Sequence, residues 1–263
     1  MPNRPNLQRF LDRLTIRSIL TEEEQEAVLS LPGQAEQVHG NQDFVRLGER
    51  VDHSCLIVAG IVGRFDQNGE GIRQITAMHI PGDMCDLHSV VQPTPTSALQ
   101  ALSVSTILRI PHTAIRSAAA EYPAVAEALW RDCMVDASIL CEWVVNVGRR
   151  DAKMRVAHLL CEMASRLGAM VEGLDDIVFD LPVTQTQVAD ATALTPVHVN
   201  RTLQSLRAER LVDWHQRVVR LPRLKALMRL AEFDSDYLQS DVKPEERLRI
   251  VNGERSGKPR RTN

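Results

Sequence analysis

The sequence predicts an α+β protein: an N-terminal β jelly-roll, then a long helix, then a C-terminal winged helix-turn-helix domain. Three observations predict this architecture. Residues 36 to 111 form short β-rich runs separated by glycine, which is typical of a jelly-roll or small barrel. Residues 130 to 144 carry apolar side chains with a period of 3.5, which is typical of a helix that pairs with another helix. Residues 181 to 214 have the pattern of two short helices followed by a β-ribbon.

The N-terminal part, residues 1–121, is predicted to be a barrel preceded by helices. Residues 5–31 have a helical pattern, in which Thr21 and Glu24 form a capping box and Pro32-Gly33 ends the helix. Asn68-Gly69 indicates a hairpin and Pro81-Gly82 another turn. The strands are expected at 54–59, 61–65, 73–80 and 98–110.

The long helix is predicted at residues 122–147. Its apolar seam consists of Trp130, Met134, Ala137, Cys141 and Val144, which are spaced 4, 3, 4 and 3. Spacing alone leaves two alternatives: the seam pairs with a second chain, or it packs on the barrel of its own chain. Gly148 is expected to break the helix and Asp151 to cap the next one, which places a hinge near Val147–Arg150.

The helix-turn-helix signals lie close together in the third part, residues 148–239. Thr184 is a candidate N-cap for the first helix, and Thr195 caps a second helix with Pro196 at its first position. One face of the second helix is apolar. The side chains turned away from this face are Val197, His198, Asn200, Arg201, Gln204 and Arg207. Such a face suits a recognition helix; the alternative is an ordinary helical hairpin with a solvated polar face.

Two further features favour DNA binding over the plain hairpin. Residues 211–221 alternate in β fashion around a polar tip at Gln216-Arg217, which predicts a wing. Residues 184–229 hold eight Lys/Arg and three Asp/Glu, a local charge of +5 in a chain of net charge −3. Contacts to DNA phosphates require such a basic patch. Pro222 opens a last helix, and the charged residues 240–263 are predicted to be a mobile tail.

Composition excludes several other classes of protein. With 44% hydrophobic and 25% charged residues, the chain is typical of a soluble globular protein. No apolar run approaches the roughly 20 residues that span a bilayer, and the N-terminus has no apolar signal-peptide core, so we expect a cytoplasmic protein without a membrane partner. No nucleotide-binding loop or hydrolase motif is present, so we do not expect an enzyme.

The five cysteines indicate neither a disulfide framework nor a metal or cofactor site, because their number is odd and no C-x-x-C pair occurs. Each is expected to be a small buried apolar residue. A redox-sensing thiol is the alternative.

The order of these parts resembles the Crp/Fnr family of bacterial transcription regulators, over residues 15–232. The most specific segments are LTPVHVNRTLQSLRAERLV (194–212) and HIPGDMCDLHS (79–89), which resemble the family's recognition helix and the turn of its cyclic-nucleotide-binding-type barrel. The resemblance implies a homodimer on a palindromic DNA site, with recognition helices about 34 Å apart. It also implies contact with RNA polymerase and a signal that acts in the barrel, and it favours pairing of the seam between chains.

The resemblance also implies which residues contact DNA. The positions that face base edges are Pro196, Val197, His198 and Arg201, and the phosphate contacts are Thr184, Thr186, Thr195 and, at the wing tip, Arg217. Arg201 can bind guanine O6 and N7, whereas Val197 can only touch a thymine methyl group. The cyclic-AMP-responsive members have Arg and Glu where this chain has Pro196 and Val197, so we expect a different operator. Ala193 stands at the turn where many members have glycine, and it is strained if that residue needs a positive φ.

The effector site departs from the family pattern. Cyclic-nucleotide binders carry Gly-Glu-Leu and, about ten residues on, Arg-Ser or Arg-Thr; here Cys85-Asp86-Leu87 and Thr96-Ser97 stand in those places. The implied pocket residues are Gly82, Asp86, Leu87, Thr96 and Ser97. Because the phosphate-binding arginine is missing, we expect no cyclic AMP binding of the usual kind.

The residues give little support for the other cofactors by which members of the family sense signals. The chain has no cysteine before Cys55, unlike the oxygen-sensing members, and His53, His79 and His88 are haem ligands by residue type only. We predict no cofactor, and the effector is unidentified or absent. The alternative function is a small-ligand-binding module whose helical half contacts protein instead of DNA.

Overall fold

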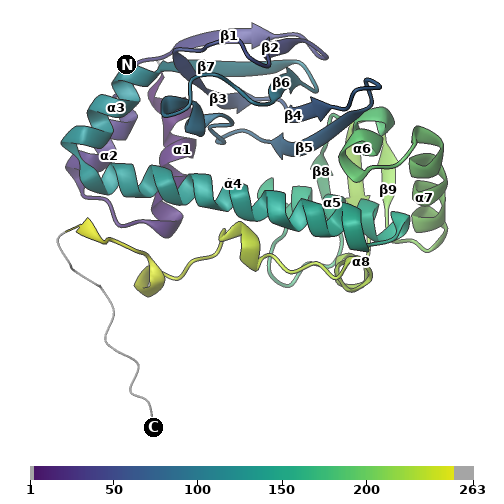
Figure 1. Ribbon diagram of the computed structural model, residues 1–263. Helices are drawn as coiled ribbons and strands as arrows, with labels where there is room; N and C mark the ends of the chain where they lie inside the picture. Colours follow the sequence, from purple (N-terminus) through teal and green to yellow (C-terminus); the bar gives the residue numbers. More distant parts are fainter. Residues whose placement is uncertain (1–2, 252–263) are drawn as a thin grey trace.

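The computed structural model describes residues 3–251. Two N-terminal helices, α1 (Arg4–Arg17) and α2 (Glu22–Leu29), precede a β-barrel, and the long helix α4 (Pro123–Arg149) lies beside the barrel (Figure 1). A smaller domain with its own helices and sheet follows at the far end of α4. This order confirms the predicted α+β architecture. The capping box at the start of α2 is also confirmed, because Thr21 and Glu24 bond each other's backbone N–H groups.

The barrel consists of antiparallel strands in a pair of sheets. One sheet has the order β1-β7-β3, and the other β2-β6-β4-β5. The bounds are β1 Gln34–Val38, β2 Asp43–Val45, β3 His53–Ala59, β4 Val62–Gln67, β5 Arg73–His79, β6 Ala98–Ala101 and β7 Ser105–Pro111, with a 3₁₀ turn, η1, at Leu87–Val90. Apolar side chains from both sheets, such as Ile57, Val62 and Ile107, are buried between them. This burial holds the barrel closed.

The helices after the barrel differ from the prediction in two respects. A separate helix, α3 (His112–Glu121), precedes α4, where the sequence predicted no helix. Gly148 does not break α4, which runs on to Arg149, so the break before the next helix lies at Arg150–Asp151. A single glycine costs a helix only about 1 kcal/mol, which the packing of α4 offsets. The predicted cap at Asp151 is confirmed, because its carboxylate accepts from the N–H groups of Lys153 and Met154.

The C-terminal domain is a winged helix. Its elements are α5 (Ala152–Arg166), β8 (Ile177–Asp180), α6 (Gln185–Thr192), α7 (Pro196–Ala208), β9 (Asp213–His215), β10 (Val218–Leu221) and α8 (Leu224–Ala231). The predicted wing is confirmed as the β9–β10 hairpin, with Gln216 at a positive φ in its turn. Strand β8, which the sequence analysis did not predict, completes the sheet in the order β8-β10-β9.

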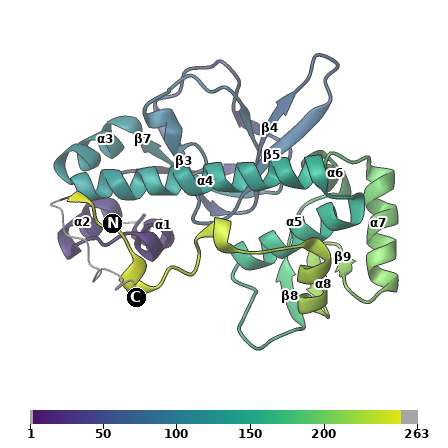
Figure 2. The ribbon, with the colours of Figure 1, turned by 60° about the horizontal axis from the view of Figure 1, so that its bottom comes forward.

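The segment after α8 corrects the predicted mobile tail. It passes through 3₁₀ turns η2 (Asp236–Leu238) and η3 (Pro244–Glu246) and returns along the molecule to the N-terminal helices (Figure 2). There Leu248 forms a parallel bridge with Ser18, and Arg249 pairs with Glu24. These contacts hold residues 240–251 in place, although the segment is charged. Residues 252–263 of the predicted tail lie outside the described residues.

Neither a membrane-spanning helix nor a cluster of metal-binding side chains occurs in the described part of the chain. Within residues 3–251, no helix is both long and apolar enough to cross a membrane. In the same part of the chain, no three His, Cys, Asp or Glu side chains are grouped so that they could hold a metal ion.

Candidate nucleic-acid interface

The helix-turn-helix is built by caps and by a small apolar core. Thr184 and Gln187 form a capping box at the start of α6, in which each side chain bonds the other residue's backbone N–H. Thr195 caps α7 by accepting from the His198 N–H at 3.2 Å. The inward faces of the two helices are buried through Val188, Ala189, Val199, Leu203 and Leu206. The orientation of α7 is therefore fixed from its inner side, as the sequence predicted.

The turn between these helices contains a strained residue. Ala193 adopts the left-handed conformation with φ 53° and ψ 43°, and its N–H bonds the Ala189 carbonyl at the end of α6. The Cβ of an L-residue crowds the following carbonyl oxygen in this conformation, which costs roughly 1–2 kcal/mol. Glycine would avoid this cost. The positive φ that the sequence analysis considered for this turn is present.

The outer face of α7 is open to solvent. Pro196, Val197, His198 and Arg201 are all exposed, and Val197 exposes 69% of its surface. The structure therefore keeps the four candidate base readers on one accessible side of the helix. A structure with His198 and Arg201 buried would have excluded a role in reading DNA.

Two amide side chains extend this face beyond the predicted base readers. The Asn200 amide donates to the Gln185 side chain at 3.3 Å, and the Gln204 amide donates to Asn200 at 3.0 Å. The helical spacing had already placed Asn200 and Gln204 on the outer face, but the resemblance did not assign them a contact. Amides of this kind can bind adenine N6 and N7.

The wing carries less net positive charge than the sequence count indicates. Strand β8 and the residue before it lie outside residues 184–229 and place two acidic side chains beside the wing arginines. Arg217 pairs with Asp180 at 2.8 Å, and Arg220 pairs with Asp176 at 2.5 Å. A phosphate at Arg217 would have to compete with Asp180. Thr184, Thr186 and Thr195, the other candidate phosphate contacts, are exposed.

The seam of α4 faces solvent in the single chain. Trp130, Met134 and Val144 expose 67%, 64% and 61% of their surfaces, and Ala137 and Cys141 are also exposed. Packing of this seam on its own barrel was one of the two alternatives, and it is wrong. A different face of α4 makes the contacts within the chain, through Val135, Ile139 and Trp143. The expectation that every cysteine is buried is wrong for Cys141, which is exposed, and for Cys133, which is half-buried.

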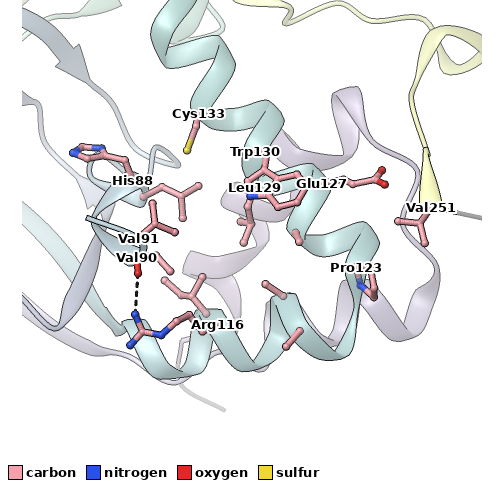
Figure 3. Close-up of a pocket in the computed structure, with 15 residues that line it drawn as sticks. His88, Val90, Val91, Arg116, Pro123, Glu127, Leu129, Trp130, Cys133 and Val251 are labelled. Atoms are coloured by element: carbon pink, nitrogen blue, oxygen red, sulfur yellow. Dashed lines mark hydrogen bonds between the residues drawn. The ribbon is translucent and has the colours of Figure 1, made fainter. Parts of the chain in front are cut away.

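An apolar groove of about 580 Å³ lies at the N-terminal end of the seam (Figure 3). Its walls come from η1, α3 and α4, and its rim includes the exposed side chains of Val91 and Trp130. Arg116 bridges the α3 side to η1 by donating to the Val90 carbonyl at 2.8 Å. The apolar surface of the seam therefore continues into a hollow at the edge of the barrel.

The candidate effector residues occupy different surroundings. Asp86 is buried, and its carboxylate accepts from the Cys55 backbone N–H at 2.6 Å. Burial raises the pKa of Asp86 to about 6. Leu87 is buried at the groove, and Gly82 is buried beside Arg9 and Arg13 of α1. Thr96 is exposed and Ser97 half-buried, both in the segment before β6.

The histidines named for haem also differ in their surroundings. His79 is fully buried, which lowers its pKa to about 4, and its Nδ1 lies 3.6 Å from Asp83. His53 contacts Asp52 at 2.9 Å, and His88 is exposed at the groove. Burial raises the pKa of the Cys55, Cys85 and Cys161 thiols, which fits the predicted apolar role of these three residues.

The barrel and the exposed recognition helix together define a class: a DNA-binding regulator with a cyclic nucleotide-binding-type domain and a winged helix. Family models match both halves. The model of the cyclic nucleotide-binding domain matches residues 35–122, and that of the Crp-like helix-turn-helix domain matches residues 154–230. The chain belongs to the Crp/Fnr family of transcription regulators.

Individual relatives span most of the chain. The fumarate and nitrate reduction regulatory protein of Vibrio cholerae is 20% identical over 84% of this chain and 88% of its own length. The transcriptional activator protein FnrL of Cereibacter sphaeroides is 25% identical over 65% of this chain and 69% of its own length. Among solved structures, FixK2 from Bradyrhizobium japonicum matches with a TM-score of 0.69 and 25% identity, over 76% of this chain and 98% of that one. The first two of these relatives are named as a regulatory protein and as a transcriptional activator.

Proposed function

We propose that this protein is a homodimer that binds a palindromic operator, reads it with the outer face of α7 and responds to a signal through its barrel. The observation that carries the proposal is the accessibility of Val197, His198 and Arg201 on a helix whose inner face is fixed in a buried core. A rigid helix with an uncovered polar face can enter the major groove without rearrangement of the domain. Arg201 would bind guanine, and Val197 would contact a thymine methyl group.

The seam of α4 supports the dimer. Its apolar side chains form a contiguous exposed stripe with heptad spacing, and such stripes mark surfaces that another protein covers. A two-fold axis along the seam would place both α4 helices in parallel contact. Each α4 leads directly to a winged-helix domain, so pairing along the seam would present two copies of α7 to adjacent turns of DNA.

The surroundings of Asp86 support a signal other than cyclic AMP. In the usual binding mode a carboxylate holds the ribose and an arginine holds the phosphate. Here one Asp86 oxygen already accepts the Cys55 N–H, and Thr96 and Ser97 supply no cation. The signal itself stays unassigned. Contact with RNA polymerase is proposed from the family alone.

Selection of bound duplexes from a random DNA pool, with and without cyclic AMP, tests the proposal. We expect a palindromic consensus with half-sites about one helical turn apart, binding that weakens steeply with salt, and no effect of cyclic AMP. Failure to retain any sequence would refute DNA reading and favour a module that contacts protein. A consensus without two-fold symmetry would refute the dimer, and enrichment only in the presence of cyclic AMP would refute the assignment of the signal.

A further inference from the structure

The winged-helix domain contacts the barrel along one face of α6. Arg73 of β5 pairs with Asp190 of α6 at 2.6 Å, and the Gln74 amide donates to the Ala191 carbonyl at 3.3 Å. The Gln187 side chain donates to the Leu102 carbonyl at 2.9 Å. The covalent connection between the domains is the hinge at Arg150–Asp151. Beside these contacts, buried apolar side chains of the barrel, of α4 and of the winged-helix domain pack in one continuous core.

A buried cluster of charged side chains around Asp83, shortly after β5, attaches the winged-helix domain to the barrel at a second place. One oxygen of Asp83 lies 2.6 Å from Arg13 of α1, and the other accepts from Arg166 of α5 at 2.7 Å. Arg166 also donates to Glu162 at 3.1 Å. The side chains of Asp83, Glu162 and Arg166 are each at most 5% exposed. This cluster joins the N-terminal helix, the barrel and the winged-helix domain.

The C-terminal strap, which we define as residues 236–251, begins at the same cluster. The Tyr237 hydroxyl donates to the Glu162 carboxylate at 2.9 Å, on the oxygen that also accepts from Trp143. The strap then runs back along the molecule beneath α4 (Figure 2). It therefore leaves the winged-helix domain at the point where that domain meets the barrel.

The other end of the strap is fixed to the N-terminal helices. The Leu248 N–H donates to the Arg17 carbonyl at 2.9 Å, and the Leu248 carbonyl accepts from Ile19 at 3.1 Å. Arg249 forms a bidentate pair with Glu24 of α2, with distances of 2.7 and 2.8 Å. Both side chains of this pair are largely buried, so the attachment is stronger than an exposed ion pair.

These attachments close a ring. Contacts run from α1 through Asp83, Arg166, Glu162 and the strap to Glu24 on α2, which α1 contacts directly. The helices α1 and α2 and the strap both lie outside the matched family models, which cover residues 35–122 and 154–230.

We propose that the C-terminal strap is a latch that holds the winged-helix domain against the barrel, and that the hinge opens only when Leu248 and Arg249 leave the N-terminal helices. A domain held at one side of a hinge can rotate, whereas a ring fixes it on both sides. The latch concerns the arrangement of the domains, so it stands or falls independently of DNA binding.

Hydrogen exchange of the full chain, followed by mass spectrometry, tests the latch. We compare the parent with Arg249→Ala, with a chain that ends at Gln239, and with Lys243→Ala as a control that removes a strap charge away from the attachment at Leu248 and Arg249. Arg249→Ala should raise exchange in α6 and β5 about tenfold, the factor that corresponds to 1.4 kcal/mol. The shortened chain should show the same pattern. Lys243→Ala should leave both elements unchanged.

The location of faster exchange decides the result. The latch predicts a change confined to α6, β5 and the Asp83 cluster, with strands β3 and β7 of the other sheet unaffected. An increase restricted to residues 240–251 would overturn the proposal, because the strap would then be free without consequence. A uniform increase over the barrel in both variants would also overturn it, because it would indicate a general loss of stability.

Discussion

Arg166 and Asp83 join the two domains through a buried ion pair 2.7 Å long, 83 positions apart in the chain. Arg13 shares the same carboxylate, and both arginines hold the pKa of Asp83 well below its usual range against the opposing effect of burial. The Asp83 carboxylate thus lies between two largely buried guanidinium groups, although Arg13 also pairs with Asp132 and Arg166 with Glu162. Its removal would leave two guanidinium groups close together with one carboxylate fewer to compensate them.

Asp83→Asn should therefore lower the free energy of unfolding by about 3 kcal/mol, since loss of one partner leaves buried charge uncompensated. Asp180→Asn is the matched control, because Asp180 pairs with Arg217 at the surface. It should cost less than about 1 kcal/mol. Urea denaturation of both variants at pH 7 checks the difference. Equal losses in the free energy of unfolding would show that the buried pair stabilises the protein no more than the surface pair does.

Asp86→Asn should stabilise the protein above pH 6. Because the pKa of Asp86 is raised to about 6, its carboxyl binds a proton more tightly in the folded chain than in the unfolded chain. The parent therefore loses about 3 kcal/mol of stability as the pH rises from about 4 to about 6, whereas the asparagine variant does not. The asparagine oxygen can still accept the Cys55 N–H. Urea midpoints of the parent and the variant, measured from pH 4 to pH 8, check this. The prediction is contradicted if the stability of the variant relative to the parent does not increase over that range.

Ala193→Gly should raise the free energy of unfolding by about 0.5–1 kcal/mol, because glycine adopts φ 53° without a Cβ clash. Ala118→Gly in the middle of α3 is the control for the added flexibility of glycine. It should lower stability by about 1 kcal/mol. Thermal melts of the two variants should shift in opposite directions. Shifts of the same sign would mean that the turn at Ala193 carries no strain.

Met134→Glu should convert the proposed dimer to monomer, because it places a charge at the middle of the apolar seam on each chain. Val171→Glu makes the same kind of change at another exposed apolar residue outside α4. Sedimentation velocity over a range of concentrations distinguishes the two variants. Dimerisation along the seam would be refuted if the parent were monomeric at every concentration, or if Met134→Glu formed a dimer as tight as that of the parent.

Arg201→Ala should weaken operator binding by roughly 1–3 kcal/mol and relax the consensus at one position in each half-site. Arg229→Ala removes an exposed charge of α8 and should leave the consensus unchanged. Gel-shift titrations with single-base variants of the selected operator measure both effects. If Arg201→Ala discriminated among these operators as the parent does, another side chain would read that position.

Helix caps, helical faces and the wing could be predicted from the sequence, because their signals lie within a few neighbouring residues. Thr184 and Thr195 cap their helices, and Val199, Leu203 and Leu206 face inward, because caps and helical periodicity depend only on residues a few positions apart. The β9–β10 wing follows from the same kind of local alternation. The resemblance then added the family, which comparison with known proteins confirmed.

Which surfaces meet could be learned from the folded chain alone. Periodicity shows that α4 has an apolar seam, but the exposed Trp130 and buried Trp143 show which face the chain itself covers. The partners Arg166 and Asp83, or Arg249 and Glu24, lie 83 and 225 positions apart. No local pattern encodes such a pairing, because it arises only when packing brings distant segments together. The tail that composition predicted to be mobile is therefore held, through residue 251, by contacts that only the folded chain creates.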